Sequence, residues 1–189
     1  MTSVLVTPPV SEPVSVDDMR AQLRLSGSQE ENLLTEFIEA ARAQIETETR
    51  RAMIRQGWRF YLEAWPMGRV VTLPIAPVLS VNEITVYDQD GTGTTLDPDD
   101  FTLDRGACPG RVRVKLGAGI PTAQLQGLEI DFTAGYGDSA ADVPAPMRQS
   151  IRLLAAHWFE NREAGTDLAM ASLPHGLDRL ISVNRVLLL

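Results

Sequence analysis

The stretch FTAGYGDSAADVPAPMRQSIRLLAAHWFENREA, residues 132–164, decides the expected fold. Gly135 and Gly137 interrupt a strand end, because glycine tolerates the positive φ angles of tight turns. Pro144 and Pro146 then favour a helix start, since the N–H that proline lacks would be unpaired in a first turn anyway. The stretch therefore predicts a long helix over residues 144–163.

The predicted helix carries an apolar stripe with the three- and four-residue spacing of a half-buried helix. The stripe consists of Met147, Ile151, Leu154, Ala155, Trp158 and Phe159. Aromatic side chains bury large areas. We therefore expect Ile151, Leu154, Trp158 and Phe159 to be structural core residues.

The order of these motifs also resembles a known family. The motif FTAGYG, a short acidic-polar linker and the run VPAPMRQSIRLLAAHWFENRE follow one another as in the head-tail connector (adaptor) family of tailed phages, which also occurs in gene transfer agents. The run TRRAMIRQGW at residues 49–58 is close to the family pattern T-G-R-A-L-I-x-Q-T-W, with Arg50 where a glycine is frequent. The residues of the first match are Ala134, Gly135, Tyr136, Gly137, Pro144, Arg148, Gln149, His157, Trp158, Glu160, Asn161, Arg162 and Glu163.

The N-terminal third predicts an arm and two helices. Residues 1–14 are rich in proline and valine and indicate an extended arm. Residues 15–53 hold two helices, each opened by a serine with an acid three residues on, at Ser15 and at Ser28. Phe37 belongs to the apolar stripe of the second helix and is a predicted core residue. The resemblance implies that this pair packs against the helix of residues 144–163.

Residues 54–133 predict β-structure, with Trp58 as a core residue of the first strand. Short apolar runs separated by glycine, proline and aspartate favour hairpins over βαβ units. Asp88–Gly93 is the clearest turn between them. The expected strands cover residues 53–64, 70–73, 78–87, 101–103, 111–116 and 128–132. The expected fold is therefore α+β: one domain over residues 1–189, with a helical core and an inserted, small, mostly antiparallel sheet.

Residues 164–189 predict a docking tail. A short helix is expected near residues 173–181, and the chain ends on the apolar run Val186, Leu187, Leu188, Leu189. Chain ends are usually polar and frayed unless something holds them. An apolar end therefore indicates docking, either onto this protein's own sheet or onto a partner.

The charge and composition exclude several classes of protein. A formal net charge of −8 lacks the basic field that binds phosphates non-specifically, which disfavours a dedicated nucleic-acid binder. Cys108 is the single cysteine, so neither an intramolecular disulfide nor a Cys-based metal site is expected. No signal peptide and no apolar run near the roughly 20 residues of a membrane span are predicted. We expect a protein made in the bacterial cytoplasm that does not enter a membrane.

No residue pattern predicts catalysis, a metal or a cofactor. His157 lies in an apolar helix face with no indicated nucleophile or orienting acid, so we interpret it as structural. Asp88 and Asp90 do not match the ligand spacing of a calcium loop and fit a hairpin tip instead. An enzyme is therefore not expected. A small hydrolase that uses His157 is the alternative from that class.

The polar cluster Glu160–Glu163 has two interpretations. A solvated helix end is one of them. An ion pair of Arg162 or Glu163, at a subunit interface or a core edge, is the other, because Arg–carboxylate pairs can be bidentate and hold a fixed geometry.

The resemblance implies a structural role in virion assembly. It implies a ring of copies, twelve in the family, that binds the portal protein on one side and a tail-side neck or stopper protein on the other, while double-stranded DNA only passes through the channel. Such a protein is incorporated in the neck of a phage or gene transfer agent particle. The candidate interface residues are Asp88, Asp90, Arg162, Glu163, Val186, Leu187, Leu188 and Leu189. A neck stopper or tail-completion protein is the nearest alternative, and a DNA-binding regulator is a third.

Overall fold

The computed structural model describes residues 2–27, 30–161 and 176–187, and they form two compact units. The helical unit comprises the described residues of 10–54 and 137–185. The sheet unit comprises the described residues of 1–9, 55–136 and 186–189. Helices and antiparallel sheets thus occupy different units, which confirms the α+β class. The further prediction that residues 1–189 are one domain stays a prediction.

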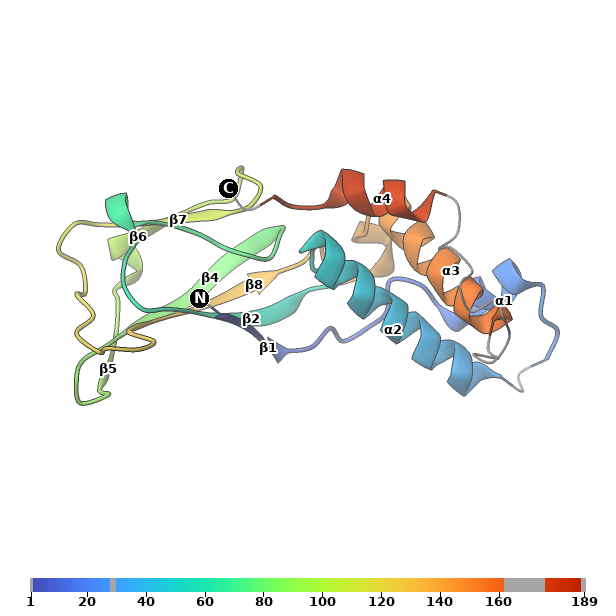
Figure 1. The fold of residues 1–189 in the computed structure, drawn as a ribbon, viewed down its shortest axis with the longest axis horizontal. Helices are drawn as coiled ribbons and strands as arrows, with labels where there is room; N and C mark the ends of the chain where they lie inside the picture. The colour runs from blue at the N-terminus through green and yellow to red at the C-terminus, as the bar shows by residue number, and fades with distance from the viewer. Residues whose placement is uncertain (1, 28–29, 162–175, 188–189) are drawn as a thin grey trace. The chain divides into compact units, whose positions relative to one another are not determined.

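The helical unit packs four helices around one apolar core (Figure 1). They are α1 (Val16–Leu23), α2 (Glu31–Thr49), α3 (Ala145–Glu160) and α4 (Leu177–Asn184). Helix α2 contacts each of the other three, and α3 contacts both α1 and α4. The predicted packing of the N-terminal helix pair against the helix after Pro144 is therefore confirmed. The buried core consists of Val14, Met19, Leu34, Ile38, Ala41, Ile45, Met53, Ile54, Val143, Met147, Ile151, Leu154, Ala155, Leu177 and Ile181.

Helix ends follow the local sequence. Ser15 caps α1 as predicted: its Oγ accepts a hydrogen bond from Asp18 N (3.1 Å), and the Asp18 carboxylate accepts one from Ser15 N (3.3 Å). Helix α2 begins at Glu31, and Ser28, its predicted cap, lies outside the described residues. Helix α2 ends at Thr49, and the next residue, Arg50, has the left-handed conformation (φ 56°). Glycine is common at this position because it lacks a Cβ.

The sheet unit contains two antiparallel sheets (Figure 1). The five-stranded sheet has the order β1 (Thr2–Thr7), β2 (Gln56–Leu62), β8 (Leu128–Ala134), β4 (Val78–Tyr87) and β5 (Gly93–Thr95). The three-stranded sheet has the order β3 (Val70–Thr72), β7 (Arg111–Val114) and β6 (Phe101–Asp104). Three short 3₁₀ turns complete the described elements: η1 (Met67–Arg69), η2 (Pro98–Asp100) and η3 (Ala140–Asp142).

Alternation along the central strand β8 gives it one buried and one polar side. On β8 the residues Leu128, Ile130 and Phe132 are fully buried. The intervening Glu129 and Asp131 pair with Arg59 of β2, whose Nε lies 2.9 and 2.7 Å from their oxygens. A period of two places successive side chains on opposite faces of a strand, so the core forms on one side only.

Two strands were missed by the sequence-based expectation, and the sheet is larger than predicted. All six expected strands are present, but the N-terminal arm is also a strand, β1, and β5 follows the turn at Asp88–Gly93. The description of the sheet as a small insertion is therefore wrong. The prolines at positions 8, 9 and 13 hid β1, because they favour an extended arm without indicating which strand it joins.

Candidate assembly surfaces

The described residues hold no arrangement typical of a metal centre. No group of three or more His, Cys, Asp or Glu side chains within them could hold a metal ion. His157 lies near the end of α3, where its Nδ1 is 3.3 Å from Nδ2 of Asn161, and the same amide donates to the His157 carbonyl oxygen (2.8 Å). This is a local helix-end contact. Among the helices that the structure describes, none is both long and apolar enough to span a bilayer.

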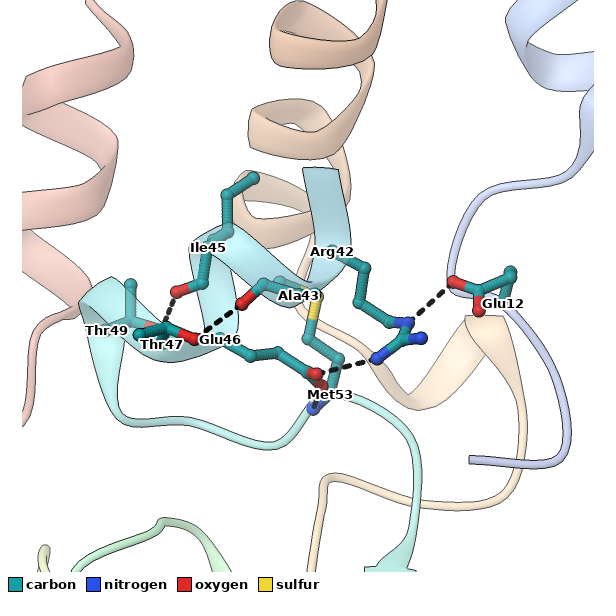
Figure 2. A network of polar contacts seen from close by, with 8 residues as sticks. All are labelled: Glu12, Arg42, Ala43, Ile45, Glu46, Thr47, Thr49 and Met53. Atoms are coloured by element: carbon teal, nitrogen blue, oxygen red, sulfur yellow. Dashed lines mark hydrogen bonds and ion pairs between the residues drawn. The ribbon is translucent and has the colours of Figure 1, made fainter. Parts of the chain in front are cut away.

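The strongest polar cluster of the helical unit lies in the last turns of α2 (Figure 2). Arg42 donates from Nε to Glu12 (2.8 Å) and from an Nη atom to Glu46 (2.8 Å). The other oxygen of Glu46 accepts from the backbone N–H of Met53 (2.7 Å). Only 13% of Arg42 and 11% of Glu46 side-chain surface is exposed. The cluster thus ties the segment before α1 and the segment after α2 to the same helix end.

Burial and the neighbouring charges shift the pKa of Arg42 in opposite directions. Burial alone would lower the pKa of its guanidinium, because desolvation disfavours a charge. The hydrogen bonds and charges of Glu12 and Glu46 outweigh this and raise the pKa above its usual value. Arg42 is therefore a permanent cation whose two partners hold it in place. The sequence analysis missed this cluster, and the i, i+4 spacing of Arg42 and Glu46 was its only local sign.

A pair of arginines, Arg51 and Arg185, joins the ends of α2 and α4. Arg51 donates from Nε to the backbone oxygen of Asn184 (2.6 Å), and Arg185 donates from Nε to the backbone oxygen of Glu48 (2.9 Å). The last carbonyls of a helix lack intrahelical partners and carry the negative end of the helix dipole. Each arginine therefore stabilises the end of the other helix, and together they fix where α4 ends.

The C-terminal segment is only partly available as a docking tail. Leu177 and Ile181 of α4 are buried in the helical core, and Val186 is 4% exposed. Leu187 is 68% exposed, and Val183 of α4 is 76% exposed. Leu188 and Leu189, the remaining members of the predicted apolar end, lie outside the described residues. The exposed part of this candidate surface therefore starts at Leu187.

At the hairpin tip between β4 and β5, the side chain of Asp88 stabilises the turn itself. Asp88 Oδ1 accepts from the backbone N–H groups of Asp90 (3.0 Å) and Thr92 (2.8 Å), which closes the turn. The Asp88 and Asp90 side chains are both exposed.

The remaining predicted residues lie around the cores or outside the described chain. Ile151 and Leu154 are fully buried, whereas Trp158, Phe159 and Phe37 are partly buried against the helical core. The Phe37 and Trp158 rings lie 6.3 Å apart at a tilt of 53°. In the sheet unit, Trp58 is half-buried opposite Phe132. Arg162 and Glu163 lie outside the described residues, so both interpretations of the Glu160–Glu163 cluster stay open.

Comparison with known proteins assigns the fold to a family of structural virion proteins. Residues 13–95 match the family described as phage gp6-like head-tail connector protein. A chain in the structure of the neck of an empty gene transfer agent particle, computed with C6 symmetry, is 33% identical with a TM-score of 0.82. The alignment covers 100% of this chain and 97% of that chain. A search of curated proteins finds no match.

Two further solved structures give the same result. A chain in the virion of a native gene transfer agent particle is 34% identical to this chain, with a TM-score of 0.81. A chain in the neck of the native particle, computed with C12 symmetry, is 33% identical, with a TM-score of 0.79. Both alignments cover 100% of this chain and 97% of the other. These relatives are structural components of a phage-like particle. The chain belongs to the phage gp6-like head-tail connector family, which is structural and not enzymatic.

Proposed function

We propose that this protein forms a ring of twelve copies in the neck of a phage or gene transfer agent particle, between the portal protein and a tail-side neck protein. The observation that carries the proposal is full-length similarity to a chain of a particle neck, at 33% identity and a TM-score of 0.82. The C6 and C12 symmetry of the relatives supports a cyclic assembly. A closed ring of identical chains needs head-to-tail contacts that join two different surfaces of the chain.

The charge of the chain fits a channel component that DNA passes without binding. The net charge is −8, whereas proteins that hold duplex DNA neutralise its phosphates with lysine and arginine. Within the described residues, the acidic side chains include Asp88, Asp90, Glu129 and Asp131, and Arg59 already pairs with the last two.

The proposed function is tested by measuring the mass of the purified protein alone and mixed with its portal by light scattering. We expect a small species alone and a large complex when the portal is present. A small species that ignores the portal and instead binds a preformed connector ring would indicate the stopper or tail-completion alternative. Hydrolase activity that is lost in a folded His157→Ala variant would place the protein in a different class.

The exposed side chain of Leu187 supports a specific portal contact. Leu187 is 68% exposed, directly after the buried Val186 and the arginine pair that fixes the end of α4. An apolar end of this kind suits a groove on a partner, with order gained on binding. Deletion of residues 187–189 leaves α4 intact and is expected to abolish the complex with the portal. If the truncated chain still forms that complex, the portal contact lies elsewhere.

A further inference from the structure

The outer edge of β1 differs from the other edge of the same sheet. Within the part of the chain that the structure describes, Thr2–Thr7 forms an edge strand of the five-stranded sheet and pairs with β2 alone. Val4, Leu5 and Val6 are 46%, 41% and 53% exposed. The register with β2 is regular from Thr2 to Leu5 and shifts between Leu5 and Thr7. An edge strand carries a row of backbone N–H and C=O groups that can pair with another chain.

The opposite edge carries the features that protect a sheet from such pairing. This edge is formed by β5, which has only three residues and pairs with Thr85, Val86 and Tyr87 of β4. Glu83 adds an exposed charge beside the Thr95 hydroxyl, which donates to it (2.7 Å). Short edge strands, bulges and charges are the usual protections of a sheet edge. Strand β1 has no charge and no proline in its six residues.

We propose that the outer edge of β1, residues Thr2–Thr7, is a subunit interface to which an extended segment of a second copy of this chain adds as a further strand. This inference rests on the proposed ring, because a head-to-tail contact covers an edge of one copy with a different surface of the next. Backbone hydrogen bonds supply the affinity in strand addition, and the alternating side chains supply the selectivity.

Charge favours a second copy as the occupant. Each chain carries a net charge of −8, so the net electrostatic interaction between two copies is repulsive. The first eleven residues carry no charged side chain, and the first charge after them is Glu12. The β1 edge is therefore a place where two acidic chains meet without like-charge repulsion, through apolar side chains and backbone groups.

Photo-crosslinking from the edge identifies its occupant. In a Cys108→Ser background, a benzophenone maleimide is attached to a Val6→Cys variant. Met67→Cys is the control, because Met67 is fully exposed and lies on η1, outside β1. Full-length protein assembled with its portal is then irradiated. We expect a covalent product of twice the 20.7 kDa chain mass from Val6→Cys and not from Met67→Cys. A product with the portal protein, or none, overturns the assignment to a second copy.

A pair of charge variants tests whether the edge matters for assembly. Thr2→Lys/Val6→Lys places lysines on the edge, as natural edge strands do. Met67→Lys/Leu116→Lys adds the same charge at two exposed positions outside β1. We expect the edge variant, with unchanged circular dichroism and Tm, to lower the fraction of chain in the portal complex by at least about tenfold, since a strand addition involves several backbone hydrogen bonds.

The two proposals fail in different ways. If the edge variant enters the portal complex to the same fraction as the wild type, the β1 interface is overturned and the proposed connector function still stands. A wild-type chain that never enters a complex with the portal overturns the connector ring, and the interface with it. Loss of assembly in the control variant as well as in the edge variant would show that added charge alone is responsible, which also overturns the interface.

Discussion

The helical unit and the sheet unit reach stability by different routes. The helical unit buries fifteen apolar residues in one cluster and adds partly buried ion pairs around Arg42. The sheet unit relies on one alternating face per sheet and leaves its polar face to charged side chains such as Arg59, Glu129 and Asp131. The cap of α1 depends on a local contact, whereas the strands and the ends of α2 and α4 depend on partners far along the chain. Substitutions should therefore act differently in the two units.

The largest expected effect comes from the helical core. Leu154→Ala removes a fully buried side chain of α3 and is expected to lower the free energy of unfolding by about 2–5 kcal/mol, because both burial and close packing are lost. Urea denaturation followed by Trp158 fluorescence, in a Trp58→Phe/Trp65→Phe background, reports the helical unit. Ile130→Ala, which truncates a fully buried side chain of β8, is the matched change in the sheet unit. If Leu154→Ala left the Trp158 transition unchanged, Leu154 would not be part of the core.

The next effect concerns the Arg42 cluster. Arg42→Met keeps the length of the side chain but removes the guanidinium that pairs with Glu12 and Glu46 in a partly buried site. We expect a loss of about 2 kcal/mol, below the 3–5 kcal/mol of a fully buried pair, because Glu12 is 24% exposed. Arg113→Met, at an exposed position of β7, is the control and should change stability by less than about 0.5 kcal/mol. Thermal unfolding measures both, and equal effects would contradict the prediction.

The cap of α1 gives a smaller, pH-dependent effect. Burial tends to raise the pKa of Asp18, but the hydrogen bonds from Ser15 and the charge and hydrogen bond of Arg152 outweigh this and lower it. A lowered folded-state pKa means that the carboxylate stabilises the fold above its unfolded pKa of about 3.9, and that this contribution is lost as the pH falls through the folded pKa.

Asp18→Asn tests this contribution. At pH 7 the variant is expected to be less stable than the wild type by up to about 1 kcal/mol, because Ser15 remains as the N-cap and only the carboxylate near the helix N-terminus is lost. The difference should shrink as the pH falls below about 4 and disappear when Asp18 is protonated in both states. Denaturation at a series of pH values measures it. A difference that is constant down to pH 2 would exclude ionisation as the cause.

The smallest effect is a stabilisation at the end of α2. Arg50 is exposed and has a φ of 56°, which costs free energy for a residue with a Cβ. Arg50→Gly is expected to raise the free energy of unfolding by about 0.5–1 kcal/mol, since part of the gain is offset by the flexibility of glycine in the unfolded chain. Ala43→Gly, in the middle of the same helix, should destabilise instead. A loss of stability in Arg50→Gly would show that the arginine side chain contributes there.

The sequence was sufficient for features that arise from neighbouring residues. The cap at Ser15, the helix start at Pro144 and the apolar stripe through Ile151 and Leu154 all involve contacts within a few positions of the chain. The six expected strands were equally readable, because alternation and turn residues act locally. The motifs FTAGYG and VPAPMRQ, recognised by resemblance, led to the head-tail connector family, which the comparisons confirm.

The tertiary structure decided what depends on residues far apart in the sequence. The pairing of Thr2–Thr7 with Gln56–Leu62 joins segments about fifty positions apart, and no local pattern specifies that register. The Arg51–Asn184 and Arg185–Glu48 contacts span more than 130 positions. Side chains at such distances meet only after the core has formed. For this reason the free edge of β1 and the fixed end of α4, the surfaces proposed for assembly, became visible only in the folded chain.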